Sequence, residues 1–361
     1  MDCGRVRSRC KKASRSLGYV TNFAYGPVAK RELTYGSFKR ALMKVSVVIP
    51  SYNRAYTLRD ALASVLNQTY RKFEIFLVDD GSSDGTNELV TSIPGDKIGY
   101  IRHERNRGCS AAYNTGISAA TGELVPFLDS EDLWKPDYLE RQLGLMSRHP
   151  EVSAVFCDTE IHGETTMPSL IGLMKVFPKL LEANPKAEEF VFASRQIHLC
   201  LLQEAPIKPS ALIVKREALE RSGLFDEAWP SGTDWDLLLR LSRSACFGYL
   251  NRPLVIQRRT ADATHQKFQE QDKQFLLNVF LAEKRKLRKD HEALRAVNRG
   301  ISSHCSNLGF LYLHSRRRRK SAAVYFRGFL ETHEPMMLLR AASVLLPSGF
   351  RDALRNVIHR G

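Results

Sequence analysis

The chain has 361 residues, of which 43% are hydrophobic, so it is long enough for one large or two ordinary domains with a buried core. No apolar run reaches the roughly 18 residues of a membrane-spanning helix, and residues 6–15 are too basic and polar for the apolar centre of a signal peptide. Seven scattered cysteines without metal-binding spacing indicate a reducing compartment.

The net charge of +15 is concentrated at the two ends of the chain. Residues 1–44 contain 11 Lys or Arg against 2 acidic residues, and residues 266–361 contain 19 against 8, which leaves −5 for the stretch between them. A mildly acidic middle argues against the basic groove that nucleic-acid binding needs. The basic ends suit an anionic membrane surface or an acidic partner, and equally suit solvated charge that keeps a protein in solution.

From residue 45 the predicted elements alternate between strand and helix. Thr57 is the expected N-cap of the first helix, and Gly122 the expected C-cap of the third. Strands are expected at 45–50, 73–78, 98–102 and 124–128, and helices at 57–68, 86–92 and 110–120. This alternation predicts an α/β fold, a Rossmann-like, mostly parallel sheet with helices on both faces and function at the carboxyl ends of its strands.

The rest of the chain is less regular. Residues 160–205 have no clear assignment, and 197–202 fit a strand or a helix. Other stretches predict helices at 138–147, 216–222 and from 233, strands at 153–157, 210–215 and 247–257, a loop at 258–265, and then helices at 275–297, 303–313, 322–330 and 336–346. We therefore expect a basic irregular arm at 1–44, an α/β domain at 45–265, and a basic, all-helical C-terminal region at 266–361.

An acidic cluster follows the fourth predicted strand. Asp129, Glu131 and Asp132 occupy three of four successive positions. Like charges this close repel, and burying them is costly unless a cation or hydrogen bonds compensate. Hard oxygen ligands suit Mg²⁺ or Mn²⁺, while the alternative is a solvated acidic turn that precedes the next helix. Because no glycine-rich dinucleotide or Walker motif is present, a bound phosphate would be held through a metal and carboxylates.

Six stretches taken together resemble the family 2 glycosyltransferases. They are 45–54, 66–70, 78–84, 106–116, 127–132 and 233–236, with the sequences VSVVIPSYNR, LNQTY, VDDGSSD, NRG to NTG, FLDSED and TDWD. The resemblance covers about 45–265 and implies the A-type glycosyltransferase fold, a catalytic domain over that range, a nucleotide-sugar donor and a divalent metal, Mn²⁺ or Mg²⁺.

The resemblance implies a role for each matching residue. Asp234 is the general base that takes the proton of the acceptor hydroxyl, and Asp79 is structural. Glu131 and Asp129 bind the metal, with His265 as a further ligand, while Trp235 and Asp132 contact the acceptor. The donor nucleotide is bound by Pro50, Ser51, Tyr52, Arg54, Asp80, Asn106, Arg107 and Asp129, with Tyr52 against the base.

Two positions depart from the family pattern. Glu131 stands where the family usually has Asp, and Thr233 stands where it usually has Glu. Asp234 keeps its carboxylate at the start of a predicted helix, where the dipole favours the ionised form. A simple helix N-cap is the alternative role for Asp234.

Three hypotheses follow. The first is an inverting, metal-dependent transfer of one sugar to a glycan, lipid-linked or other hydroxyl acceptor, on the cytoplasmic side, in cell-surface polysaccharide synthesis. The second is a catalytically weakened nucleotide-sugar or glycan binder. The third, a scaffold binding nucleic acid through 316–319, is not expected. The predicted helix 336–346, beside Arg351, Arg355 and Arg360, suits peripheral binding to an anionic membrane surface.

Overall fold

The computed structural model describes residues 43–229, 232–259 and 269–346, and its centre is a 9-stranded sheet. Four strands of the first half are parallel neighbours in the order β3-β2-β1-β4. They are β1 (Val45–Ser51), β2 (Phe73–Asp79), β3 (Ile98–Arg102) and β4 (Leu124–Pro126). Every residue of β1 is buried, as its continuous apolar sequence predicts for a central parallel strand.

The second half of the sheet is mixed. Beyond β4 the order continues β8-β6-β9-β5, with β7 paired to β9. β8 is antiparallel to both neighbours, while β6 and β9 are parallel. These strands are β5 (Leu133–Trp134), β6 (Val152–His162), β7 (Glu189–Phe192), β8 (Leu212–Lys215) and β9 (Cys246–Arg258).

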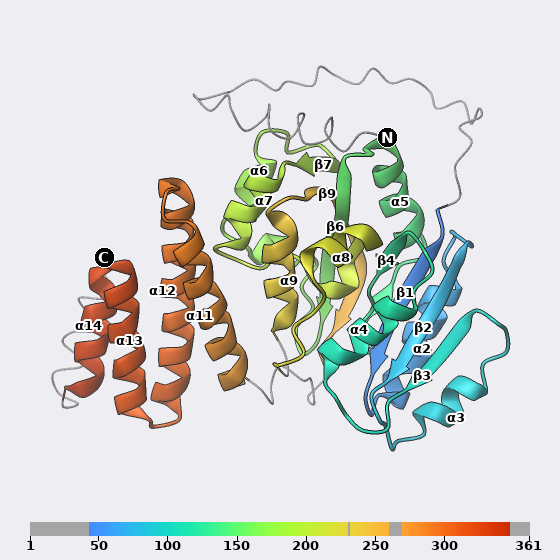
Figure 1. The fold of residues 1–361 in the computed structure, drawn as a ribbon, viewed down its shortest axis with the longest axis horizontal. Coiled ribbons are helices and arrows are strands. Elements are labelled where there is room, and N and C mark those ends of the chain that lie inside the picture. The colour runs from blue at the N-terminus through green and yellow to red at the C-terminus, as the bar shows by residue number, and fades with distance from the viewer. Residues whose placement is uncertain (1–42, 230–231, 260–268, 347–361) are drawn as a thin grey trace.

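Helices cover both faces of the sheet (Figure 1). One face packs against α2 (Ala55–Leu66), α3 (Thr86–Thr91) and α5 (Tyr138–Arg148). The other packs against α4 (Cys109–Ala119), α6 (Phe177–Leu181), α7 (Ser194–Leu201), α8 (Arg216–Ser222) and α9 (Thr233–Ser242). The predicted α/β architecture is therefore confirmed.

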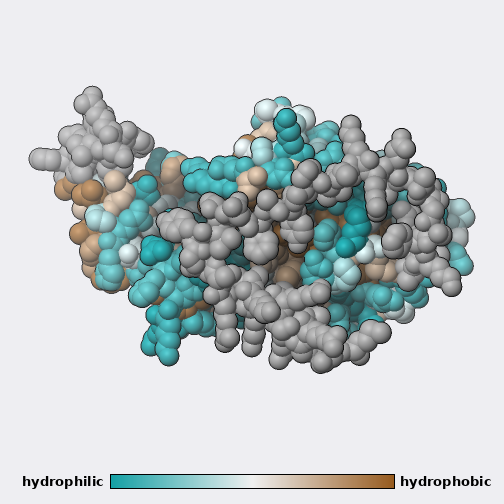
Figure 2. Space-filling model, turned by 90° about the horizontal axis from the view of Figure 1, so that it is seen from above, coloured by the Kyte–Doolittle hydropathy of each residue, from teal (hydrophilic) through white to brown (hydrophobic). Residues whose placement is uncertain are grey.

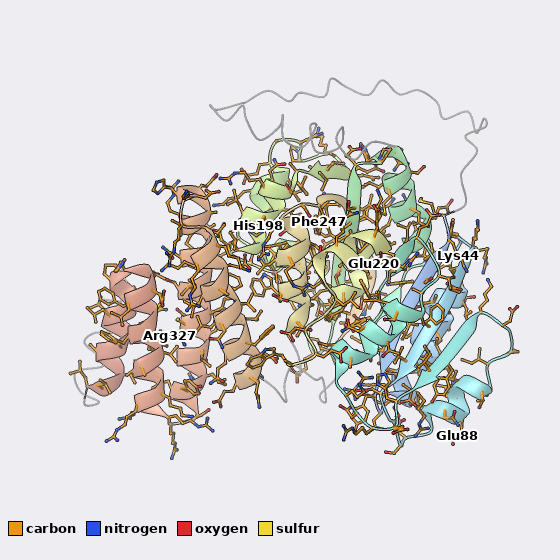
Figure 3. The ribbon with its side chains drawn as sticks, in the orientation of Figure 1. Lys44, Glu88, His198, Glu220, Phe247 and Arg327 are labelled. Carbon is orange, nitrogen blue, oxygen red and sulfur yellow. The ribbon has the colours of Figure 1, made fainter. Side chains whose placement is uncertain are left out.

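The C-terminal helices lie beside one another on the α9 side of the sheet (Figure 1). They are α11 (Gln269–Lys286), α12 (His291–His314), α13 (Arg318–Thr332) and α14 (Pro335–Leu345). Their apolar side chains belong to the same core cluster as those of α7 and α9. α7 is joined to α9 by His198, labelled in Figure 3, whose Nδ1 lies 2.8 Å from Ser242 Oγ. None of the described helices is long and apolar enough to cross a membrane.

Several local predictions were wrong. α2 begins before Thr57, and Arg54 is its N-cap, because the Thr57 hydroxyl instead donates back to the Arg54 carbonyl. α4 ends with Ala120 as its C-cap, so Gly122 has another role. A Cβ at Gly122 would lie 2.6 Å from the Lys44 carbonyl oxygen, so this glycine allows a close backbone approach beside β1.

Other ranges were corrected or resolved. Residues 197–202 are helical in α7, up to its C-cap Leu202. The single helix predicted at 275–297 is two helices, because Asp290 caps α12 by accepting a hydrogen bond from the Ala293 backbone N–H. The loop predicted from residue 258 starts one residue later, since Arg258 is the last residue of β9. The arm at 1–44 and the 265/266 boundary fall almost wholly outside the described residues, so this division stays a prediction.

Candidate active site at the carboxyl ends of the strands

The loops after β1 and β2 are bonded to each other. Ser51 and Asp79 are register partners at the ends of these strands, and the Asp80 N–H donates to the Ser51 carbonyl at 2.8 Å. Asn53 has a φ of 52°, a left-handed conformation that asparagine tolerates, and its Oδ1 accepts a 2.8 Å hydrogen bond from the Ser83 N–H. Pro50 and Ser51 are buried, whereas Tyr52 is 45% exposed, so its ring is open to a ligand.

Asp80 holds the loop that leads into α4. Its Oδ1 accepts the Arg107 N–H at 2.9 Å and lies 2.7 Å from His103 Nδ1, and its Oδ2 accepts the Gly108 N–H at 2.8 Å. Asp79 is likewise engaged, by the Tyr100 hydroxyl at 2.6 Å and the Ser82 N–H at 2.8 Å. Both carboxylates therefore shape the two loops in this structure.

The side chains of the 106–107 turn point outward. Asn106 and Arg107 are exposed, and Arg107 Nη2 lies 3.1 Å from Glu227 Oε2. Glu227 Oε1 also accepts a 2.8 Å bond from the Asn114 amide, whose group further bonds the Phe225 backbone. This network ties α4 and the loop before it to the loop before α9.

Asp129 lies just beyond β4, and its carboxyl group interacts with two other carboxylates of the site, those of Glu131 and Asp234. The Tyr113 hydroxyl donates to Asp129 Oδ1 at 2.5 Å, and the Asp129 N–H donates to Ser210 Oγ at 3.1 Å. Burial raises the pKa of Asp129 to about 6; the charges of Glu131 and Asp234 raise it too, while the Tyr113 hydrogen bond lowers it. These three carboxylates are therefore close enough to repel one another.

Asp132 supports this loop from beneath. It is 1% exposed, its Oδ2 accepts the Ser210 hydroxyl at 2.6 Å, and its Oδ1 accepts the Arg258 N–H at 3.3 Å. Burial and then the charge of Asp129 raise its pKa well above the ordinary range. The structure thus gives Asp132 two protein partners and almost no open surface for the acceptor predicted to contact it.

Glu131 projects from the loop toward α2. Its Oε2 lies 3.5 Å from Arg54 Nε, while its backbone carbonyl accepts a hydrogen bond from Arg258 Nε. Arg258 also reaches Asp60 Oδ2 at 2.9 Å and the Thr57 carbonyl at 3.1 Å, so it fastens the acidic loop to α2.

Asp234 lies in the first turn of α9. Its neighbour Thr233 has its hydroxyl oxygen 2.7 Å from that of Ser110, which joins the first turn of α9 to the first turn of α4. Asp234 also borders a small apolar hollow with Phe127, just after β4, and Phe225. Thr233, which replaces the family's usual Glu, thus positions the helix start that carries Asp234.

The surroundings of Cys109 show which acidic residues lie near one another. Cys109 is the first residue of α4, and its surface is open to solvent. Protein atoms packed around the thiol raise its pKa well above the ordinary range; so do four carboxylates, those of Asp129, Asp234, Asp80 and Glu131. The candidate acidic residues from three separate segments, after β2, after β4 and at the start of α9, therefore share one site.

Two predicted site residues remain, Trp235 and His265. Trp235 is half-buried on the side of α9 that faces the C-terminal helices, where its indole N–H donates to the Leu201 carbonyl at 2.8 Å and its ring packs against Phe280 and His304. The structure does not bring it to the carboxylates. His265 lies outside the described residues.

The donor set at this site fits a divalent cation. The part of the chain that the structure describes contains no group of three or more His, Cys, Asp or Glu side chains that would hold a metal by themselves. Asp129 and Glu131 nevertheless supply carboxylate oxygens on one short loop, and burial together with the charges of Glu131 and Asp234 raises the pKa of Asp129. Mg²⁺-type sites commonly use one or two carboxylates, with substrate phosphates and waters completing the shell.

Sequence reasoning missed several residues that build the site. They are His103, Cys109, Tyr113, Ser210 and Arg258. His103 carried a usable signal, since it directly follows β3 and therefore lies at the same sheet edge as Asp80. Arg258 carried none, because its role depends on β9 reaching the acidic loop from 126 residues away in sequence.

The sequence matches the model of "Glycosyl transferase family 2" over residues 46–221. An uncharacterized glycosyltransferase of Rickettsia typhi is 31% identical over 220 residues, 61% of this chain and 64% of its own length. The Escherichia coli "UDP-Glc:alpha-D-GlcNAc-diphosphoundecaprenol beta-1,3-glucosyltransferase WfgD" is 36% identical over 117 residues, 32% of this chain and 46% of its own. The matches thus span less than two thirds of each relative's length.

A solved structure is similar over most of the chain. S. aureus TarS 1–349 in complex with UDP-GlcNAc aligns with a TM-score of 0.63 and 18% sequence identity, over 87% of this chain and 86% of that one. At this identity the likeness concerns the fold. Residues 46–221 therefore form a glycosyl transferase family 2 domain, and the fold is that of the A-type glycosyltransferases.

Proposed function

We propose that this chain is an inverting glycosyltransferase that moves one sugar from a nucleotide-sugar donor to a hydroxyl acceptor with the help of a divalent cation. The observation that carries the proposal is that three acidic segments meet at α4 and the loop before it. Asp80 accepts the Gly108 N–H, Asp129 accepts the Tyr113 hydroxyl with Glu131 on the same loop, and Thr233, next to Asp234, is bonded to Ser110. A diphosphate donor and a carboxylate cluster repel each other, so a cation between them makes both stable in one site.

The donor nucleotide occupies the edge formed by the β1 and β2 loops. The exposed ring of Tyr52 offers a face for base stacking, and the loop carrying Asn106 and Arg107 is held in place by Asp80. Arg54 brings a positive charge to the Glu131 side of the site. The Tyr113 hydroxyl orients the Asp129 carboxylate, which stays fixed relative to the sheet.

Asp234 accepts the proton of the acceptor hydroxyl. Its position at the start of α9 is fixed by the bond between Thr233 and Ser110. A base on one side of the sugar and a leaving diphosphate on the other produce inversion. A bound cation would be held by Asp129 and Glu131 and would neutralise charge that develops on the leaving diphosphate.

The proposed reaction belongs to cell-surface polysaccharide synthesis. WfgD, by its name, acts on a lipid-linked diphosphate sugar with a UDP-glucose donor, and an acceptor of that class, or another glycan, suits this chain. The sugar and the nucleotide of the donor are to be identified by screening a panel of nucleotide sugars. The alternative is a catalytically weakened nucleotide-sugar binder, which turnover in the same screen would eliminate.

The proposed location is the cytoplasmic face of a membrane, by peripheral contact through α13 and α14. Brown, hydrophobic surface gathers at the end of the molecule formed by these helices (Figure 2). It includes five side chains exposed by 40% or more, Phe326, Leu330, Leu338, Leu339 and Leu345. Flotation with anionic vesicles tests this contact, which would be refuted by recovery of the protein in the vesicle-free fraction.

The decisive test of function is release of nucleoside diphosphate from a panel of nucleotide sugars with Mn²⁺ and candidate acceptors. We expect turnover by the wild type and at least a hundredfold loss in Asp234→Asn, because a general base contributes about 10²–10⁴-fold. Equal turnover in Asp234→Asn would remove the base assignment. Donor binding without any turnover would favour the weakened binder.

A further inference from the structure

A second cavity lies in the C-terminal helices, at the meeting point of three helix ends. It has a volume of about 340 Å³ and is lined by Leu281, Lys284, Arg285, Arg288, Leu294 and Glu331. Ligand pockets typically have about 300–1,000 Å³. The cavity is thus large enough for a small group such as a phosphate or diphosphate together with the first carbons attached to it.

The C-terminal end of α11 and the turn after it supply most of the wall. Leu281, Lys284 and Arg285 follow the spacing i, i+3 and i+4, which places them in one stripe on the helix, and Arg288 lies in the turn that follows α11. Leu281 is 5% exposed and forms an apolar floor at the base of this stripe. The cationic groups therefore stand at the rim of an apolar surface that is already partly withdrawn from water.

The acidic side chain that lines the cavity is already paired with a lysine. Glu331, its single acidic lining residue, lies 3.3 Å from Lys284 Nζ. The neighbouring Lys286 is paired with Glu283 at 3.0 Å. Within the described residues, the side chains of Arg285 and Arg288 form no ion pair or hydrogen bond. Two guanidinium groups three residues apart in sequence thus line a cavity without an acidic partner of their own.

This cavity is separate from the candidate active site. Gly232, at the start of α9, is close to Asp272 in the first turn of α11, whereas Arg285 lies in the last turn of α11. At about 1.5 Å of rise per residue, the 13 residues between Asp272 and Arg285 span roughly 20 Å. A ligand here would not occupy the donor position.

We propose that this cavity is a binding site for a phosphate-bearing anion, with Arg285 and Arg288 as its ligands and Leu281 and Leu294 contacting carbon next to the phosphate. A guanidinium pairs with phosphate oxygens through two parallel N–H bonds, which makes paired arginines well suited to this group. The anion also relieves the repulsion between the two cations. The ligand chemistry is that of a lipid phosphate headgroup or of a soluble phosphate, and it does not depend on the proposed transferase reaction.

The test compares two double variants of the full chain that lose the same charge. Arg285→Gln/Arg288→Gln removes the cavity cations, while Lys179→Gln/Lys186→Gln removes two exposed cations in and just after α6, outside the C-terminal helices. Pyrophosphate binding is measured by calorimetry in EDTA, which prevents metal-dependent binding at the acidic site. Binding to phosphatidic acid vesicles is measured by sedimentation at constant ionic strength.

We expect the cavity variant to lose about tenfold or more in affinity relative to the charge-matched control in at least one arm, since each guanidinium makes charge-assisted bonds. Loss in the vesicle arm alone assigns a lipid headgroup, and loss in the pyrophosphate arm assigns a soluble phosphate. Equal binding by the two variants in both arms, or no binding by the wild type in either, would overturn the proposal. Far-UV circular dichroism of both variants verifies that the helices remain folded.

Discussion

The Tyr113 hydroxyl donates a 2.5 Å hydrogen bond to Oδ1 of Asp129, joining the middle of α4 to the loop after β4. The Tyr113 ring stacks on Phe225, with centroids 4.8 Å apart, and packs edge-on to Phe127. A residue of the apolar core thus holds the carboxylate that the donor's cation would meet. Tyr113 therefore orients the Asp129 carboxylate and lowers its pKa, against the larger raising effect of burial.

The pH dependence of cation binding follows from the raised pKa of Asp129, which burial causes. The pKa of Asp129 is about 6 in the folded protein, so protons compete with a cation for this carboxylate below that pH. Mn²⁺-dependent donor binding should therefore strengthen as the pH rises through about 6 and level off above it. Calorimetric titrations from pH 5 to 8 measure this, and an affinity that is flat over the range would contradict the prediction.

Tyr113→Phe tests the hydrogen bond with the ring retained. Loss of the bond removes an interaction that lowers the pKa of Asp129, so the midpoint of the pH profile should move upward by roughly one unit. The stacking on Phe225 is preserved, so the thermal stability should change little. An unchanged midpoint would show that the bond does not control Asp129.

Arg258 should matter for the acidic loop although it is remote in sequence. Arg258→Gln loses the bonds to Asp60, Thr57 and Glu131, and we expect a loss of about 1–3 kcal/mol in the free energy of unfolding together with weaker donor binding. Arg252→Gln is the matched control on β9, because Arg252 has no such bond within the described residues. Equal effects of the two substitutions in urea denaturation would refute the assigned role.

His304 should make the packing of α12 on α9 sensitive to acid. Burial, with a smaller effect of Lys273, lowers its pKa to about 4, and it packs between Trp235 and Phe280. The folded pKa lies below the ordinary value of 6.5, so the unfolded chain binds the proton first. This stability contribution is complete above pH 6.5 and is lost as the pH falls toward 4.

The His304→Phe variant should therefore lose less stability than the wild type between pH 6.5 and 4. His291→Gln, which removes an exposed histidine of the same helix, serves as the control and should follow the wild type. Denaturant midpoints at several pH values give the comparison. Parallel curves for the wild type and His304→Phe would show that this residue does not carry the acid sensitivity.

Gly300 marks the closest approach between α12 and the rest of the molecule. A Cβ at this position would lie 2.3 Å from the Leu202 carbonyl oxygen and 2.3 Å from the Phe280 ring. We expect Gly300→Ala to destabilise the protein by about 1–3 kcal/mol, despite the better helix propensity of alanine. Gly144→Ala is the control, since its Cβ would meet only the flexible end of Arg148, at 3.3 Å. A stabilised Gly300→Ala would contradict this packing.

The sequence was most informative where local pattern decides structure. The parallel strands β1 to β4 and the helices between them follow from apolar runs and helical spacing, and the loops after β1, β2 and β4 place Tyr52, Asp80 and Asp129 at one edge. Helix ends were less predictable: Thr57 is a sound capping residue by type, yet α2 starts earlier because the Arg54 carbonyl accepts the first-turn bonds.

Contacts between residues far apart in the sequence could not be predicted from local sequence patterns. Nothing near Trp235 in the sequence shows that it faces α12, because this depends on helices that begin more than 30 residues later. The partners of Asp132, Ser210 and Arg258, are likewise 78 and 126 residues away. Acidic residues at a strand end indicated a site. Only the structure shows which of these carboxylates are open to a ligand and which are bonded to other protein groups.

The central claim is that the gathered carboxylates bind a nucleotide sugar through a cation, and one measurement tests it directly. A panel of UDP- and GDP-sugars is screened by thermal shift with Mn²⁺ or EDTA, using the wild type, Asp234→Asn, Glu131→Gln and Asp129→Asn. We expect at least one donor to raise the melting temperature by several degrees with Mn²⁺, since a bound ligand at a hundred times its Kd adds about 2.7 kcal/mol. The shift should persist in Asp234→Asn and disappear with EDTA, in Glu131→Gln and in Asp129→Asn; no shift with any donor, or a shift unaffected by EDTA and by both loop substitutions, would contradict the account.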